Sequence, residues 1–223
     1  MATLFLVRHG LTAQTGRVLY GRTAGISLDH RGMAQAEALV ERFADVRLTA
    51  IYSSPLDRCV QTVEPLAAAR RLAVRTEAAV IEMDAGSWTG RTLAQLRRTK
   101  AWSAVQREPA AFTFPGGGEA FPSAQARVVE GLERIARRHR RGAVVVATHG
   151  DIVRIALAHF AATPLDEFQR IVVDTASVSV VELGGPRPHV VLVIDTGGLT
   201  RLQRTPIAPW EADGQRAGRK MRG

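Results

Sequence analysis

The chain has a single cysteine, Cys59, among its 223 residues. An intramolecular disulfide is therefore excluded, and so are a multi-cysteine zinc site and an iron–sulfur cluster. No apolar run reaches the roughly 18 residues that a transmembrane helix needs. The N-terminal apolar run has no basic stretch before it and continues into Arg8-His9, so it predicts a strand and not a signal peptide. These absences lead us to expect a cytoplasmic protein without membrane contact.

Several catalytic signatures are also missing. The sequence contains no GxxxxGK[ST], GxSxG or HExxH, so nothing supports a P-loop nucleotide hydrolase, a serine hydrolase or a zinc protease. Acidic residues are fewer than basic ones, 21 against 30, which gives a net charge of +9. Such a charge attracts anions of every kind, from nucleic acids to phosphorylated metabolites. Because 28 of the basic residues are arginine, codon bias is an equally good explanation.

The hydrophobic pattern alternates between strands and helices. This alternation predicts an α/β domain with a largely parallel sheet and antiparallel last strands. Residues 16–28 and 82–90 are predicted loops. We expect strands at 2–7, 50–52, 72–75, 143–147, 170–183 and 189–194, and helices at 29–43, 54–70, 91–107, 123–140 and 151–161.

Two helix starts carry explicit signals. Asp29 precedes apolar residues at helical spacing and is a predicted N-cap. Ser54-Pro55 predicts a second start, with serine as N-cap and proline at the first helical position. At the other end, residues 201–223 carry six basic and two acidic groups. We therefore divide the chain into a domain over 1–196 and a basic polar tail over 197–223, for which we expect partial disorder.

The most informative pattern is a hydrophobic strand that ends in His-Gly and occurs twice. One copy ends at His9-Gly10, and the other ends at His149-Gly150. Ligands of open α/β sheets bind at the carboxyl ends of the strands, so neighbouring strands would place both imidazoles in one crevice. Glycine after each histidine allows a tight turn and close approach of a ligand.

Two arginines add positive charge to this crevice. Arg8 directly precedes His9, and Arg58 lies one turn into the helix that follows the second strand. A helix N-terminus favours anions, and guanidinium groups bind phosphoryl oxygens through charge-assisted hydrogen bonds. The combination predicts a phosphoryl-binding site. Cys59 has no catalytic context of this kind, and we expect it to pack in the core.

Five collinear segments resemble the histidine phosphatase superfamily, also called the phosphoglycerate mutase-like family. The match to its Arg-His-Gly signature is accompanied by a Ser-Ser-Pro…Arg…Gln-Thr segment, a Glu…Gly…Trp-x-Gly loop, a Pro-Gly-Gly-Glu segment and a second histidine motif. In the same order, the five segments of this sequence that match these motifs are Leu6-Val7-Arg8-His9-Gly10, 53–62, 82–90, 114–119 and Thr148-His149-Gly150. The resemblance extends over residues 4 to about 195 and implies a three-layer α/β/α sandwich with a mostly parallel, mixed sheet.

The resemblance also implies roles for individual residues. His9 is expected to be the nucleophile that becomes phosphorylated, and Glu82 the group that donates a proton to the leaving oxygen; Asp84 is a rival for that acid role. Arg8, Arg58 and His149 are expected to hold the phosphoryl oxygens. These assignments need neither a metal nor a cofactor, because phosphoryl transfer depends mainly on positioning and electrostatic stabilisation.

The sequence departs from the family's mutases at the mouth of the site. Leu11 stands where mutases have glutamate, and Gln14-Thr15 where they have Trp-Asn. Thr15, Gly21-Arg22 and Gly150 are the candidate substrate contacts here, with Arg22 a candidate for a second anionic group. The departures favour a metal-independent phosphatase of the histidine acid phosphatase type, acting on a small phosphorylated metabolite and releasing inorganic phosphate.

Two alternatives stay open at this point. One is a cofactor-dependent phosphotransferase of the phosphoglycerate mutase type. The other is a non-catalytic protein that binds phosphate or nucleic acid, which the basic composition allows but which would not need a nucleophile and a matched acid. Nucleic acid is therefore a disfavoured partner. The resemblance includes homodimers among the expected assembly states.

Overall fold

The computed structural model describes residues 1–196. The strands are β1 (Ala2–Arg8), β2 (Val18–Leu19), β3 (Leu48–Ser53), β4 (Val74–Thr76), β5 (Arg91–Thr92), β6 (Ala143–Thr148), β7 (Val178–Leu183) and β8 (His189–Asp195). The α-helices are α1 (His30–Arg42), α2 (Asp57–Arg70), α3 (Leu93–Leu96), α4 (Lys100–Arg107), α5 (Phe121–Arg138) and α6 (Gly150–Phe160). Four 3-10 helices are η1 (Ala78–Val80), η2 (Gly86–Trp88), η3 (Pro109–Ala111) and η4 (Leu165–Arg170). The prediction for the tail, 197–223, lies outside the described residues.

Six strands form one mixed sheet in the order β4-β3-β6-β1-β7-β8. The first four are mutually parallel, and β7 runs antiparallel to β1, as does β8 to β7. The predicted antiparallel character of the last strands is therefore confirmed. A separate two-stranded sheet joins β2 to β5, pairing Val18 with Thr92.

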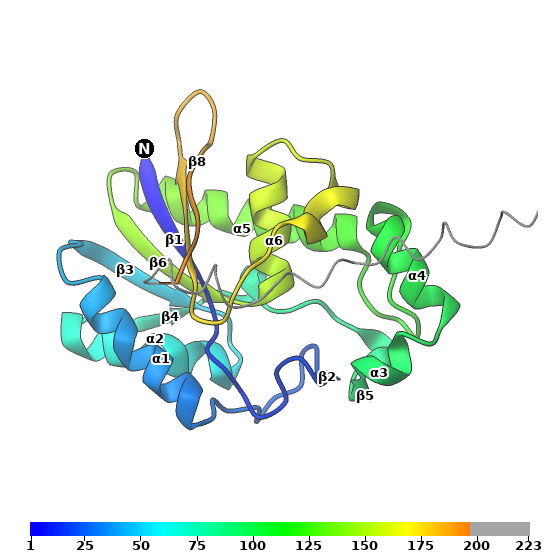
Figure 1. Ribbon diagram of the computed structural model, residues 1–223. Coiled ribbons are helices and arrows are strands. Elements are labelled where there is room, and N and C mark those ends of the chain that lie inside the picture. Colours follow the sequence, from blue (N-terminus) through cyan, green and yellow to red (C-terminus); the bar gives the residue numbers. More distant parts are fainter. Residues whose placement is uncertain (197–223) are drawn as a thin grey trace, which may run out of the picture.

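The sheet separates two hydrophobic clusters. Successive side chains of a strand point to opposite faces, and β6 shows this directly. Val144 and Val146 belong to the cluster under α5 and α6, whereas Val145 and Ala147 belong to the cluster under α1 and α2. Figure 1 shows these two helix pairs on opposite faces of the sheet. The arrangement confirms the three-layer α/β/α sandwich.

Three local predictions differ from the structure. Ser54 does not cap α2, which begins at Asp57 with Leu56 at the cap position and no side-chain cap bond. The helix predicted at 91–107 is divided into α3 and α4, because Thr92 and Thr99 each cap a separate helical start. The strand predicted at 170–183 begins only at Val178.

Each difference has a local cause. The Ser54 hydroxyl is bonded elsewhere, to His149. Thr92 and Gln95 form a reciprocal capping box, so α3 starts there independently of the later turns. Before β7, Ala176 takes a left-handed conformation with φ of 54°, which interrupts an extended chain. By contrast, the predicted cap of α1 is confirmed, since the Asp29 carboxylate accepts from two backbone amides of its first turn.

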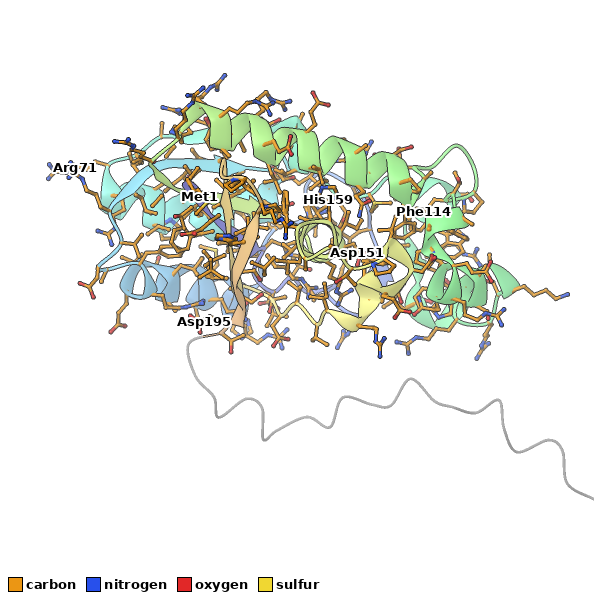
Figure 2. The ribbon with its side chains drawn as sticks, turned by 90° about the horizontal axis from the view of Figure 1, so that it is seen from above. Met1, Arg71, Phe114, Asp151, His159 and Asp195 are labelled. Atoms are coloured by element: carbon orange, nitrogen blue, oxygen red, sulfur yellow. The ribbon has the colours of Figure 1, made fainter. Side chains whose placement is uncertain are left out.

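The segment between η1 and α5 lies beside the sheet and not on it. Figure 1 shows β5, α3 and α4 together at one end of the molecule, away from β3 and β4. Figure 2 shows Phe114 of this segment and Asp151 of α6 in the same half of the molecule, with Arg71 at the opposite end. The pairing of β2 with β5 attaches this segment to the loop that follows β1.

Candidate active site

Two neighbouring strands bring the histidines together. β1 and β6 are parallel and in register, with Arg8 opposite Thr148, so His9 and His149 both follow the carboxyl ends of their strands. The two ring centroids are 5.4 Å apart with an interplanar angle of 64°. The His9 backbone amide also donates to the Thr148 carbonyl at 2.8 Å. The predicted common crevice is therefore present.

The environment of His9 determines where its proton sits. Nδ1 lies 2.8 Å from the Gly10 carbonyl oxygen, which can only accept, so Nδ1 carries the hydrogen. Nε2 is then unprotonated, and it has no hydrogen-bond partner within residues 1–196. Burial, together with the charges of Arg8 and Arg58, lowers the pKa of His9 to about 3. At neutral pH the ring is uncharged, with a free lone pair on Nε2.

His149 is fully buried behind His9. Its Nε2 is 2.8 Å from the Ser54 hydroxyl, and its Nδ1 is 3.8 Å from a carboxylate oxygen of Glu82. Burial, followed by the neighbouring His9 and Arg58, holds the pKa of His149 well below its usual value. The Cys59 thiol also lies 3.4 Å from Nε2, within the buried cluster under α2. Cys59 thus packs in the core as predicted, with a contact to His149 that the sequence did not indicate.

Arg58 is fixed by backbone carbonyls and an aromatic ring. It is fully buried, and its Nη2 donates to the Gly21 carbonyl at 2.8 Å. Its guanidinium carbon lies 4.7 Å from the centroid of the Tyr20 ring, a cation–π contact. On the other side of the site, Arg8 donates through Nη1 to the Val173 carbonyl at 2.6 Å. The Nε–H groups of Arg8 and Arg58 are buried and have no partner within the described part of the chain.

Glu82 faces the same space from the segment after η1. One of its carboxylate oxygens accepts from the Met83 amide at 2.9 Å. Burial, with the nearby Asp151 carboxylate, raises the pKa of Glu82 to about 7. A carboxyl group with this pKa can give up and regain a proton near neutral pH. The rival Asp84 is bonded to the Gly86 amide and does not line the cavity.

A clamp of charged residues holds the backbone around Glu82. Arg22 donates through Nε to the Glu82 carbonyl at 2.9 Å, and Arg127 donates to the carbonyls of Ala79 and Ile81. Glu119 connects the two guanidinium groups, at 3.0 Å from Arg22 and 2.8 Å from Arg127. Arg22 therefore acts on the segment that carries Glu82.

The glycines after the histidines are explained by close packing. Neither Gly10 nor Gly150 has a positive φ angle, so the tight turn expected from the sequence is not what requires them. A Cβ atom at Gly150 would lie 3.1 Å from Nε of Arg8, and one at Gly10 would lie 2.9 Å from the Gly32 carbonyl. Gly150 thus leaves room for a guanidinium group at the N-terminus of α6.

A cavity of about 420 Å³ opens over these groups. Arg8, His9 and Glu82 line it, and Arg58 and His149 lie buried next to them. We call these five side chains the charged floor. Apolar residues form another part of the lining, and we call them the apolar wall: Val18, Leu19, Tyr20, Trp88, Leu93, Trp102, Val105, Phe114, Phe121 and Phe168. The same lining also contains Arg97, Gln106, Asp151, Arg154 and Gln169, so the cavity offers both apolar surface and polar groups beside the floor.

The structure distributes the predicted site residues in three ways. Arg8, His9, Thr15, Gly21, Glu82 and Gly150 line the cavity. Arg58 and His149 are fully buried immediately behind it. Arg22 is not among the lining residues, because its guanidinium group is bonded in the clamp.

Some lining residues were not found from the sequence. Arg154 lines the cavity and pairs with Asp151 at 3.0 Å. A sequence signal for it exists, since positions three and four apart on a helix share a face and Arg154 follows Gly150 by four residues. Tyr20 and Trp102 carry no local signal, because the main-chain segments that bear them meet only in the folded protein.

Within residues 1–196, no group of three or more His, Cys, Asp and Glu side chains could hold a metal ion. In the same part of the chain, no helix is both long and apolar enough to cross a membrane.

Comparison with known proteins gave consistent matches. A model of the histidine phosphatase superfamily (branch 1) matches residues 4–196. The chain is 32% identical to phosphoserine phosphatase 1 of Hydrogenobacter thermophilus over 87% of its own length and 92% of the relative's. It is also 32% identical to a metal-independent phosphoserine phosphatase of Arabidopsis thaliana, over 68% and 65% of the two chains. Among solved structures, Bacillus stearothermophilus YhfR superposes with a TM-score of 0.80 at 30% identity, covering 86% of this chain and 96% of that one.

Proposed function

We propose, from the premise that the chain belongs to the histidine phosphatase superfamily (branch 1), that it hydrolyses phosphomonoesters of small metabolites. The reaction passes through a phosphohistidine at His9 and needs no metal ion. Its relatives support phosphatase function. The observation that carries the mechanism is the state of His9. Its Nδ1 is bonded to the Gly10 carbonyl, and its Nε2 lone pair is free at the bottom of the cavity.

The charged floor binds the phosphoryl group in this mechanism. Arg8 and the N-terminus of α6 at Gly150 line the cavity and supply donors for its oxygens, and the positive charge of Arg58 lies buried beside them. His149 adds a neutral imidazole beside His9. Fixed cations thus stabilise the charge that metal ions balance in other phosphoryl-transfer enzymes.

The first chemical step forms a phosphohistidine. Nε2 of His9 attacks phosphorus, so an N–P bond forms while the bond from phosphorus to the ester oxygen breaks. Glu82 donates its proton to the departing oxygen and becomes a carboxylate. Its raised pKa makes the protonated form available near neutral pH.

The second step regenerates the enzyme. The Glu82 carboxylate takes a proton from a water molecule as the water oxygen bonds to phosphorus. The N–P bond breaks, inorganic phosphate leaves, and His9 recovers its lone pair. Dividing the reaction in this way replaces one difficult displacement by two easier ones. Phosphoserine, the substrate in the relatives' names, is the first metabolite to test.

The test is hydrolysis of p-nitrophenyl phosphate in the presence of a chelator. We expect turnover by the wild type and none by His9→Ala, with acid-labile phosphate trapped on the wild type only. His189→Ala is the matched control, since His189 is 57% exposed on β8. Activity retained by His9→Ala would overturn the covalent mechanism. Transfer of the trapped phosphate to a second organic phosphate, and not to water, would show a mutase instead.

A further inference from the structure

The peptide group between Gly10 and Leu11 is hydrogen-bonded on both sides. Its carbonyl oxygen lies 2.8 Å from Nδ1 of His9, the contact that leaves the Nε2 lone pair free. Its N–H donates to the side-chain oxygen Oε1 of Gln35 at 2.9 Å. Because the carbonyl and the N–H of a peptide group are held in one plane, this rigid unit connects the nucleophile to a side chain of α1.

The amide of Gln35 binds in a single orientation. The Leu11 N–H can only donate, so the Gln35 oxygen faces it and the amide nitrogen Nε2 points the other way. That nitrogen donates to the Thr175 hydroxyl oxygen at 3.0 Å. Gln35 is half-buried and Thr175 is buried, so both hydrogen bonds are partly shielded from water. Glutamine thus uses its acceptor on one side and its donor on the other.

Thr175 belongs to a segment that holds Arg8. On one side of it, the Val173 carbonyl accepts from Nη1 of Arg8 at 2.6 Å. On the other side, the Ala176 amide donates to the Arg8 carbonyl at 2.9 Å. Gln35 therefore joins the segment that fixes Arg8 to the peptide group that fixes the nucleophile.

The start of α1 lies directly on the chain that follows the nucleophile. The Asp29 amide donates to the Leu11 carbonyl at 3.0 Å, so both backbone groups of Leu11 are bonded to this helix and its cap. A Cβ atom at Gly32 would overlap the same carbonyl oxygen, which shows how closely the helix approaches. Gln35 lies three residues further along and shares a helix face with Gly32, so the fold itself places its side chain at Leu11.

This arrangement matters most while the nucleophile reacts. As Nε2 of His9 bonds to phosphorus, the ring keeps its Nδ1 hydrogen and acquires positive charge. The Gly10 carbonyl then accepts from a charged donor, and such hydrogen bonds are stronger than those between neutral groups. Donation of the Leu11 N–H to Gln35 polarises the same peptide group and strengthens its carbonyl as an acceptor. The gain is larger in the transition state than in the ground state, so it raises kcat.

We propose that Gln35 is a positioning residue for His9. It acts through the Gly10–Leu11 peptide group, which keeps the Nδ1 hydrogen in place and Nε2 directed at the phosphoryl group. The inference rests on the proposed function, because it assigns the role to a reaction at His9. Gln35 is not among the residues that line the cavity, so its effect should be the same for every ester.

The first test is Gln35→Met, because methionine has a similar length and no strong donor or acceptor. We expect kcat for p-nitrophenyl phosphate and for ethyl phosphate to fall by the same factor, about tenfold, with KM within about twofold. Glu37→Met is the matched control, since Glu37 is exposed on the same helix, and it should leave both rates nearly unchanged. Unchanged kcat in Gln35→Met, or a change in KM alone, would overturn the inference.

Two milder variants identify which hydrogen bond matters, and they replace Gln35→Met if that variant does not fold. Gln35→Glu keeps an oxygen that accepts from the Leu11 N–H, so it should retain most of the rate. Thr175→Val removes only the outer hydrogen bond and should lower kcat about threefold. A loss in Gln35→Glu as large as about tenfold would show that the acceptor oxygen is not what supports His9.

The Nδ1–H proton of His9 gives a readout that does not depend on turnover. Its NMR signal in the wild type is identified by its loss in His9→Ala. Gln35→Met should move this signal to higher field, because a weaker hydrogen bond to the Gly10 carbonyl deshields the proton less, and Glu37→Met should not move it. A fall in kcat with this signal unchanged would assign Gln35 a structural role only and contradict the proposal.

The outcomes separate the two proposals. If no ester is hydrolysed in a His9-dependent manner, the proposed function fails and the positioning role fails with it. If hydrolysis depends on His9 but Gln35→Met changes neither kcat nor the Nδ1–H signal, the phosphatase mechanism stands and the role of Gln35 is wrong.

Discussion

The charged floor and the apolar wall are built in different ways. The floor is assembled at the carboxyl ends of neighbouring strands, and its polar groups are fixed by backbone carbonyls such as those of Gly10 and Gly21. The wall comes from segments outside the main sheet, part of which the pairing of β2 with β5 joins and part of which belongs to α5 and η4. The floor thus has a geometry imposed by the sheet, whereas the wall depends on contacts among short elements.

This difference suggests a division of labour. A phosphoryl group is the same in every monoester, so a rigid floor can serve any substrate. The organic group varies, and the wall that faces it can change without disturbing the strand ends. Substitutions in the floor should therefore affect all substrates alike, and substitutions in the wall should affect only those that reach it.

The largest effect expected is that of Arg58→Met. Removing a fixed cation from the phosphoryl site should lower kcat/KM by about 10²- to 10³-fold. The loss should be equal for ethyl phosphate and phosphoserine, because Arg58 acts on the group they share. Arg137→Met is the control, since Arg137 is 62% exposed on α5.

Arg58→Lys is needed beside it, because Arg58 is fully buried and the methionine variant could be unstable. Lysine keeps the charge but cannot reproduce the paired carbonyl contacts of the guanidinium group, so an intermediate rate is expected. A loss confined to one of the two esters would break the distinction between floor and wall.

The sequence predicted the floor far better than the wall. His9 and His149 could be located because each ends a hydrophobic strand, and adjacent parallel strands necessarily place their ends together. Arg58 followed from its position near a helix start. Each of these residues is placed by the local element that carries it, so a local pattern was sufficient.

The wall was missed for a corresponding reason. Trp88 and Trp102 stack only because the chain between them forms two separately capped helices, α3 and α4, where the sequence predicted one. Ser54 was misplaced in the same way, since its hydroxyl lies 2.8 Å from His149, 95 residues away in the chain, and the one amide donation to it that precedes α2 is a long one from Leu56, at 3.4 Å. Such long-range contacts have no local signature.

The second prediction concerns Glu82→Gln, which should distinguish leaving groups. Glutamine cannot donate a proton as an acid, so kcat for alkyl phosphates should fall by about 10²-fold or more. p-Nitrophenyl phosphate, whose leaving group needs no proton, should lose less than about tenfold. Glu133→Gln is the control, since Glu133 is 50% exposed on α5, and it should leave both rates nearly unchanged. Equal losses for the two esters would contradict the acid role and reduce Glu82 to a structural part of the floor.

The third prediction is that the floor makes stability depend on pH and the wall does not. Burial depresses the pKa of His9 to about 3 in the folded state, so between about pH 6.5 and 3 the unfolded chain binds a proton that the folded one does not. This contribution of His9 is present above pH 6.5 and is lost as the pH falls, by about 2 kcal/mol at pH 5. The raised pKa of Glu82 acts in the opposite direction over the same range, so the effect of His9 is measured as a difference from a His9 variant.

Denaturant unfolding at pH 7.5 and pH 5 measures this effect. The wild type should lose more stability than His9→Asn between the two pH values, whereas Trp102→Ala should show the same pH dependence as the wild type. If His9→Asn and the wild type lose equal amounts, the buried neutral imidazole is not a feature of the folded state.

The smallest effect expected is that of Arg22→Ala, and it decides between two interpretations of one residue. From the sequence, Arg22 is a candidate contact for a second anionic group of the substrate. In the structure its guanidinium group holds the Glu82 carbonyl and Glu119. Loss of about one hydrogen bond to the segment that positions Glu82 should lower kcat for ethyl phosphate about fivefold, with KM unchanged.

A substrate contact would behave differently, since KM would rise for phosphoserine and kcat for ethyl phosphate would not fall. The clamp would then be irrelevant to Glu82, and a further cation would belong to the substrate-binding surface beside the wall.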